Sequence, residues 1–534
     1  MNLLTPILFF AAAAAALPAS AQQPARPDLI VAIAVDQLSG PLFSQYRPHF
    51  TGGFKRLSEG VVFATGYQAQ AATETCPGHA TILTGAHPAR SGIIANSWMN
   101  LNAAREDKRI YCAEDERVPG SSGDNYTVSP FHLKVPALGD RMKAANPRSR
   151  VVAVAGKDRS AVMMGGHNPD HRWWWSRDRF VTHADAPQPP VAAQVNSSVA
   201  RALAQARPAI APSPFCEAKA KPIQVGQRTV GTNRYQRVAG DASAFSASPE
   251  LDAATLAMAA ALTQQLQLGK SGHTDLLAIS LAATDLVGHR YGNGGAEMCL
   301  QLQTLDSDLG SFFAVLDRLG LNYAVVLTAD HGGLDIPERQ GPPATRVDPA
   351  LNPKALSAAV AQRLGLSGEV IRGDGAFGDM YIDRSDPARN AVIQTATKEL
   401  LAGHPQVEAV LGFAELAAMP LPSGSPESWT PAQRARASFD PERSGDLVVL
   451  LKPQVTPIAS PTGTYVATHG SPWEYDRQVP IIFWWKGIQR QERSEPAMTV
   501  DIMPTLARMI GLTVPAAEID GRCLDLPGYR CPAR

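Results

Sequence analysis

An unbroken apolar run follows Asp28: Leu29-Ile30-Val31-Ala32-Ile33-Ala34-Val35, and it ends at Asp36. Because apolar and polar residues do not alternate in it, the pattern predicts a strand covered on both faces. Similar apolar runs occupy residues 150–155, 276–281, 323–328, 447–451 and 479–485, and helical patterns lie between several of them, at 251–268 and 296–319. This alternation predicts an α/β fold with a mostly parallel central sheet flanked by helices on both faces.

The composition is that of a folded chain. It has 534 residues, of which 45% are hydrophobic, enough to bury a sizeable core. Its 49 basic and 49 acidic side chains give a formal net charge of zero. Proteins that bind nucleic acids usually carry a basic excess that neutralises phosphates, so we expect no nucleic-acid partner.

The first 21 residues differ in kind from the rest. They hold no charged side chain, include an apolar run with a string of alanines, and close on Ala19-Ser20-Ala21. This pattern predicts a signal peptide over residues 1–21, cleaved near Ala21, and therefore a periplasmic or secreted protein. No later segment is apolar over the ~20 residues that a membrane span needs, so we expect no stable membrane insertion.

Residues 22–534 are predicted to form a single catalytic domain. Three of its segments are less regular and rich in Pro, Gly, Ala and polar residues, at roughly 97–147, 167–250 and 337–443. We interpret them as insertions that form a cap over the active-site edge of the sheet.

Six cysteines fit an oxidising compartment. Cys523 and Cys531 lie close together around a Pro-Gly pair, so we expect a local disulfide that closes this loop. The sequence shows no evident pairing for Cys112, Cys216 or Cys299.

Polar side chains follow four of the apolar runs. Asp36 ends the first, Lys157 and Arg159 follow the second, Asp285 follows the third, and Asp330 with His331 follows the fourth. Open parallel sheets bind ligands at the carboxyl ends of their strands. These residues therefore predict a site at that edge.

The candidate metal ligands combine carboxylates with imidazoles. Asp285 and His289 are four residues apart, Asp330 and His331 are adjacent, and Asp36 and His469 complete the set. This mixture suits zinc, is compatible with manganese or iron, and suits calcium poorly because of the histidines. A lone histidine is more often structural, so the prediction of a metal site depends on the whole set.

Thr75 is the candidate nucleophile. It begins a predicted helix in Glu74-Thr75-Cys76-Pro77-Gly78-His79, where backbone N–H groups and the helix dipole favour an anion. A threonine hydroxyl is a poor nucleophile at neutral pH, but coordination to a dication lowers its pKa. The alternative is that Thr75 only caps the helix.

These motifs occur in an order that resembles the alkaline phosphatase superfamily, including its nucleotide pyrophosphatase/phosphodiesterase branch. The resemblance spans nearly the whole chain after residue 21. It implies that one zinc is held by Asp285, His289 and His469, and the other by Asp36, Asp330 and His331 with Thr75. The two Zn²⁺ would lie about 4 Å apart. Thr75 would attack phosphorus and form a phosphothreonine that water then hydrolyses. A structural calcium ion is compatible with this picture, but no motif in the sequence specifies one.

The branch of the superfamily is predicted from the residues near Thr75. Sulfatases of this fold use Cys-x-Pro-x-Arg, whereas Thr75 and His79 stand at the Cys and Arg positions here. A phosphate monoester carries an extra negative charge, which Lys157 and Arg159 can meet, and Asn96 can donate to the same phosphoryl group. This set is similar to the bacterial phosphate-irrepressible type of alkaline phosphatase.

We therefore expect a secreted zinc-dependent alkaline phosphatase that hydrolyses small-molecule phosphate monoesters through Thr75. The first alternative is a phosphodiesterase or nucleotide pyrophosphatase of the same superfamily. The second, from another class, is a metal-binding or surface-binding protein without turnover. The presence of a nucleophile beside every expected ligand disfavours that second alternative.

Overall fold

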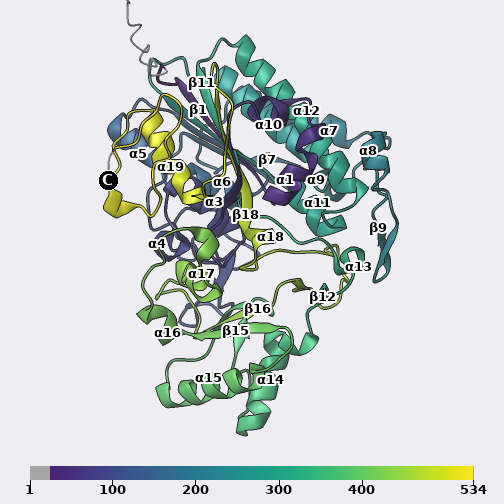
Figure 1. The fold of residues 1–534 in the computed structure, drawn as a ribbon, viewed down its shortest axis with the longest axis vertical. Coiled ribbons are helices and arrows are strands. Elements are labelled where there is room, and N and C mark those ends of the chain that lie inside the picture. The colour runs from purple at the N-terminus through teal and green to yellow at the C-terminus, as the bar shows by residue number, and fades with distance from the viewer. Residues whose placement is uncertain (1–24, 533–534) are drawn as a thin grey trace, which may run out of the picture.

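The computed structural model describes residues 25–532 and places β1 (Leu29–Val35) in the middle of a ten-stranded sheet (Figure 1). Five neighbouring strands are parallel, and β18 runs antiparallel between β11 and β2. The order is β19 (Gln491–Arg493), β2 (Val61–Tyr67), β18 (Gln478–Trp485), β11 (Tyr323–Thr328), β1, β10 (Asp275–Leu281), β5 (Val151–Ala155), β6 (His171–Ser176) and β7 (Arg179–Val181), with β20 (Ala497–Met498) beside β2. The predicted α/β fold with a mostly parallel central sheet is confirmed.

Helices cover both faces of this sheet, which explains the unbroken apolar run of β1. Val31 and Ile33 join one buried cluster, while Ile30 and Ala32 join another on the opposite face. The first cluster includes residues of α7 (Pro190–Leu203), α10 (Pro249–Gln265) and α12 (Ala296–Arg318). The second includes residues of α3 (Thr75–Thr84), α5 (Leu138–Ala145) and α19 (Ile502–Met509). Both faces of β1 are buried against apolar side chains, so apolar residues occupy every position of the strand.

The run at 447–451 belongs to a different sheet from the one its apolar character suggested. It forms β16 (Leu447–Leu451) in a small antiparallel sheet with β13 (Arg372–Gly373), β14 (Gly378–Tyr381) and β15 (Val407–Gly412). Helices α14 (Pro353–Leu364) and α15 (Pro387–Leu401) share its core. Leu447 and Val449 contribute to that core, whereas Leu450 packs in a separate buried cluster. An apolar run signals burial on two faces but not the identity of the partner strands.

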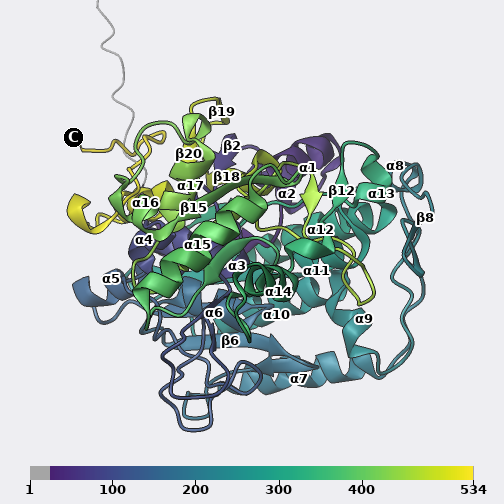
Figure 2. The same ribbon diagram turned by 90° about the horizontal axis from the view of Figure 1, so that it is seen from below.

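The small sheet and its helices form the lower end of the molecule in Figure 1 and lie nearest the viewer in Figure 2. Residues 337–443, expected as cap, supply most of it. The segment 167–250 differs from that expectation, since β6 and β7 extend the central sheet and α7 covers its face. Likewise α5, inside the expected insertion 97–147, packs on the sheet through Leu138 and Met142.

Three disulfides join the six cysteines. Cys523–Cys531 closes the predicted local loop. Cys76–Cys112 and Cys216–Cys299 were not predicted, because their partners are 36 and 83 residues apart and no local pattern links them.

The predicted signal peptide at residues 1–21 lies outside the described residues. Among residues 25–532, no helix combines the length and apolar character needed to cross a bilayer.

Candidate active site

A cleft of about 460 Å³ lies where the carboxyl ends of the central strands meet the small sheet. From the central sheet's side it is lined by residues that follow β5 and β10, among them Lys157, Arg159, Asp285 and His289. From the other side it is lined by residues of β14 and β16 and of the loops beside them. Of the strand-end residues predicted from the sequence, Lys157, Arg159 and Asp285 thus face one shared space.

Thr75 is the first residue of α3 and is 1% exposed. The helix packs closely against the loop after β11 at Gly78. A Cβ at this position would come within 2.0 Å of the Asp330 carbonyl oxygen, so the close approach requires glycine. One turn further along, the buried His79 places Nδ1 2.9 Å from the Thr75 carbonyl oxygen and 3.0 Å from Asp330 Oδ2. His79 thus connects the helix of the candidate nucleophile to a candidate metal ligand.

Asp36, Asp330 and His331 form the first group of candidate metal ligands. One ligand atom from each lies within 4.8 Å of the others. Asp330 Oδ1 accepts backbone N–H bonds from Gln37 and His331 at 3.1 and 3.0 Å, which leaves Oδ2 facing His331 Nε2 at 3.3 Å. His331 Nε2 also lies 3.4 Å from Asp36 Oδ1.

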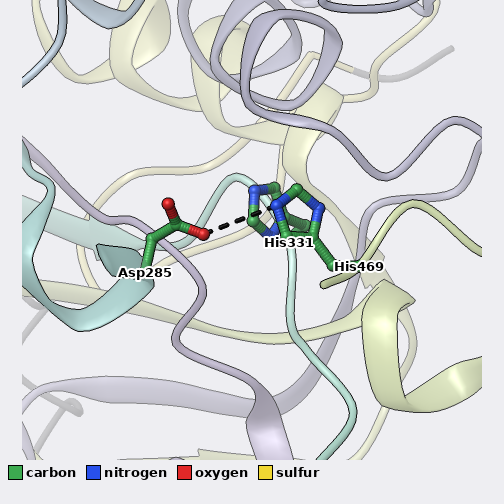
Figure 3. Close-up of side chains that lie close together, drawn as sticks. All are labelled: Asp285, His331 and His469. Atoms are coloured by element: carbon green, nitrogen blue, oxygen red, sulfur yellow. Dashed lines mark ion pairs between the residues drawn. The ribbon is translucent and has the colours of Figure 1, made fainter. Parts of the chain in front are cut away.

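The second group converges on Asp285 Oδ1. His289 Nε2 lies 3.3 Å from this oxygen and His469 Nε2 lies 3.4 Å from it. Figure 3 shows Asp285 pointing toward the imidazoles of His469 and His331. These two rings are stacked with centroids 3.6 Å apart, and Asp285, His331 and His469 also satisfy the 4.8 Å criterion together. His331 therefore stands between the two predicted ligand sets rather than in one of them alone.

The orientation of all three imidazoles, and the neutral state of two of them, suit metal binding. In His289, His331 and His469, Nδ1 bonds a backbone carbonyl oxygen at 2.8 Å, which leaves the Nε2 lone pair for a ligand. Burial lowers the pKa of His289 to about 4 and that of His331 to about 3, so both rings are neutral at neutral pH.

Three buried ligand atoms have no hydrogen-bond partner among the described residues: Asp36 Oδ1, Asp285 Oδ1 and His331 Nε2. Three buried carboxylates so close together also repel one another. Burial and the neighbouring Asp330 raise the pKa of Asp36. Buried charges are normally paired or bound to metal, so these residues fit a pair of divalent cations held by oxygen and nitrogen donors.

Lys157 joins the two groups. Its Nζ lies 2.6 Å from Asp36 Oδ2 and 2.6 Å from Asp285 Oδ2, on the oxygens opposite the unpartnered ones. Burial would lower the pKa of Lys157, but Asp285 and Asp36 raise it above its ordinary value, so the ammonium stays charged. Lys157 Nζ is also 3.4 Å from Thr75 Oγ1.

Arg159 and Asn96 complete the surroundings of Thr75. Arg159 Nη2 lies 3.5 Å from Thr75 Oγ1. Asn96 accepts the Cys76 backbone N–H at 2.8 Å through Oδ1, so its Nδ2 is the side-chain atom that can donate to a ligand. The structure thus brings all ten predicted site residues together around the cleft: Asp36, Thr75, Asn96, Lys157, Arg159, Asp285, His289, Asp330, His331 and His469.

Residues 30–472 match the sequence model of the type I phosphodiesterase/nucleotide pyrophosphatase family. The chain belongs to this family. It is 55% identical over 510 residues to alkaline phosphatase PhoK of Sphingomonas sp, covering 94% of this chain and 91% of that one. It is 49% identical to alkaline phosphatase PhoD of Zymomonas mobilis subsp. mobilis, covering 95% and 90%.

Solved structures place this type I phosphodiesterase family member in the alkaline phosphatase superfamily. The crystal structure of wild-type alkaline phosphatase PafA matches with a TM-score of 0.81 at 26% identity, over 93% of this chain and 98% of that one. Murine ectonucleotide pyrophosphatase/phosphodiesterase 5 matches with a TM-score of 0.53 at 12% identity, which shows a shared fold alone. The predicted superfamily and its fold are confirmed.

Two aromatic residues of the cleft, Tyr465 and Phe377, are not predicted by any sequence motif. The Tyr465 ring stacks on that of His289, with centroids 4.4 Å apart and planes 6° apart, and the residue is 46% exposed. Phe377, from the small sheet's hairpin, also lines the cleft. Both lie in irregular segments far along the chain from their neighbours in space, so no local pattern marks them.

Proposed function

We propose that this protein is an exported, zinc-dependent phosphomonoesterase that passes the phosphoryl group through Thr75. The observation that supports it most is the setting of Thr75 Oγ1. Lys157 Nζ and Arg159 Nη2 lie 3.4 and 3.5 Å from it, beside two groups of carboxylate and imidazole ligands. The relatives PhoK and PhoD, alkaline phosphatases by name, support phosphatase activity over nearly the full chain.

Two zinc ions would be held by the two ligand groups, where they would lower the pKa of the Thr75 hydroxyl and offset negative charge. Thr75 Oγ attacks phosphorus as the ester oxygen leaves, and the phosphothreonine is then hydrolysed by water. Arg159 and the Asn96 amide donate to the nonbridging oxygens of the phosphoryl group. Lys157 adds a fixed positive charge beside them.

The alternative is a phosphodiesterase, which the family description includes. A diester has one negative charge fewer on its phosphoryl group, so it has less need of Lys157 and Arg159. The phosphomonoesterase and phosphodiesterase proposals therefore share the fold and the nucleophile. They differ in how much the reaction depends on Lys157 and Arg159.

The test compares kcat/KM of the zinc-loaded protein on an aryl phosphate monoester and on the matching diester. We expect a strong preference for the monoester that a chelator abolishes and zinc restores. Replacing Lys157 and Arg159 together by alanine should lower monoester turnover far more than diester turnover. Arg109→Ala is the matched control, because Arg109 lines the same cleft but pairs with Asp374. A wild-type preference for the diester would move the protein to the phosphodiesterase branch.

A further inference from the structure

Arg159 reaches the cleft on a long side chain, and a contact on its far side determines where its guanidinium lies. Its Nη1 donates to the Tyr111 hydroxyl oxygen at 3.4 Å, while Nη2 points to Thr75 Oγ1 at 3.5 Å. Nε is buried without a hydrogen-bond partner among residues 25–532. Tyr111 is therefore the one side chain that anchors this guanidinium from behind within the described part of the chain.

The Tyr111 hydroxyl can act only as an acceptor toward Arg159. Its proton is donated to Asp158 Oδ1 at 2.7 Å, which leaves the oxygen lone pairs for Arg159 Nη1. Burial raises the pKa of Tyr111 well above its ordinary value, so the hydroxyl stays protonated under alkaline conditions. The same Asp158 oxygen accepts the Arg159 backbone N–H at 2.7 Å. Backbone and side chain of Arg159 are thus held by one connected network.

Tyr111 is itself tied to the nucleophile helix. It ends β4 (Arg109–Tyr111), which pairs with β3 (Ser97–Met99), and it lies opposite Ser97. The next residue, Cys112, forms a disulfide with Cys76, the neighbour of Thr75. One end of this hairpin therefore presents both Asn96 and Tyr111 to the phosphoryl site.

We propose that Tyr111 is a positioning residue that orients Arg159 toward the nonbridging oxygens of a phosphate monoester and so helps to select monoesters over diesters. This inference rests on the proposed function. Without the hydroxyl, Arg159 would lose its rear contact and sample other rotamers, and the cation would no longer be pre-organised for the extra charge of a monoester.

Tyr126 offers a matched control within the same network. Its hydroxyl donates to Asp158 Oδ2 at 2.7 Å, and its ring lies 4.7 Å from that of Tyr111. No hydrogen bond joins it to Arg159 in the described chain. Tyr126→Phe removes one tyrosine hydroxyl from the Asp158 carboxylate, as Tyr111→Phe does. It leaves the contact between Tyr111 and the Arg159 guanidinium in place.

The experiment measures kcat/KM of zinc-loaded wild type, Tyr111→Phe, Tyr126→Phe, Arg159→Ala and Tyr111→Phe/Arg159→Ala on the aryl monoester and its matching diester. We expect Tyr111→Phe to lower the monoester value about tenfold, as the loss of one charge-assisted contact would, and to leave the diester value nearly unchanged. Tyr126→Phe should resemble wild type on both. The double variant should be no slower on the monoester than Arg159→Ala, because Tyr111 acts through Arg159.

The role of Tyr111 would be overturned by equal losses on both substrates, or by additive losses in the double variant. Unchanged activity of Tyr111→Phe on both substrates would overturn it as well. The failure of the proposed function is a separate outcome, since it would appear in the wild type as a preference for the diester. Thermal melting of each variant establishes that it is folded before its kinetics are compared.

Discussion

At the residue scale, the site depends on how the oxygens of two buried carboxylates are used: in each, one binds the Lys157 ammonium, and the other stays available to a metal ion. Asp36 and Asp285 each give one oxygen to Lys157, and the other oxygen faces an imidazole. Lys157 therefore holds the two carboxylates in place without covering the oxygens that face the histidines. Thr75 lies beside this network as a hydroxyl with two cations within 3.5 Å.

Thr75→Ala should lower phosphate release from an aryl monoester by about a thousandfold or more, because the attacking oxygen is gone. Zinc should remain largely bound, since every carboxylate and imidazole ligand is retained. Steady-state kinetics and metal analysis of the purified variant check both expectations. Thr75→Ser, which keeps a hydroxyl, is the control and should retain substantial activity. An almost unimpaired Thr75→Ala would remove Thr75 from the mechanism.

Local sequence predicts the candidate nucleophile and the carboxylate ligands well, because each lies shortly after an apolar strand or at the start of a helix. Asp36, Asp285 and Asp330 follow their strands within a few residues, so their place at the sheet edge is implied by the fold class. Tyr111 and Tyr465 could not be predicted in this way. Their contacts depend on how a short hairpin and a loop fold back over the sheet edge, which neither periodicity nor turn chemistry specifies.

At the element scale, unbroken apolar runs predicted the strands, but they did not predict which strands pair with one another. β1 and β16 are both unbroken apolar runs, yet one is central in the large sheet and the other belongs to the small one. What separates them is long-range packing: β16 meets α14 and α15 in its core. The same limit applies to Cys76–Cys112, which joins α3 to the β3–β4 hairpin.

Removing the Cys76–Cys112 disulfide by replacing both cysteines with serine should affect stability and catalysis together. The loss of the cross-link should cost ~2–4 kcal/mol of unfolding free energy. Monoester kcat/KM should fall about tenfold, because Asn96 and Tyr111 lose their fixed position relative to Thr75. Denaturant unfolding and kinetics measure the two effects.

The double replacement of Cys523 and Cys531 provides the comparison. That disulfide lies in the C-terminal segment, and none of its residues lines the cleft. We expect lower stability with kcat/KM close to wild type. If both pairs change kcat/KM equally, the first disulfide has no special relation to the site.

At the scale of the whole molecule, the packing of the two sheets and their helices buries several histidines, and this burial determines how the protein responds to acid. Burial lowers the pKa of His132 and of His331 to about 3, and that of His289 to about 4. In the unfolded chain these groups titrate near ~6.5. Below that pH the unfolded state binds more protons than the folded state.

Stability should therefore be fully present above pH ~6.5 and fall as the pH drops toward 4, by up to ~1.4 kcal/mol per histidine per pH unit. His469 opposes this in part: burial would lower its pKa, but Asp285 raises it overall. Thermal melting from pH 8 to pH 4 checks the sign. His132→Gln, remote from the ligand groups, should make the decline shallower. A melting temperature that rises on acidification would contradict the account.

If the phosphoryl group passes through Thr75, the configuration at phosphorus records that passage. The measurement is the stereochemical course of phosphoryl transfer from an isotopically chiral phosphate monoester to an acceptor alcohol, catalysed by the zinc-loaded protein. Two successive in-line displacements, first by Thr75 and then by the acceptor, predict overall retention of configuration. Inversion would show a single direct displacement and would contradict a phosphothreonine intermediate.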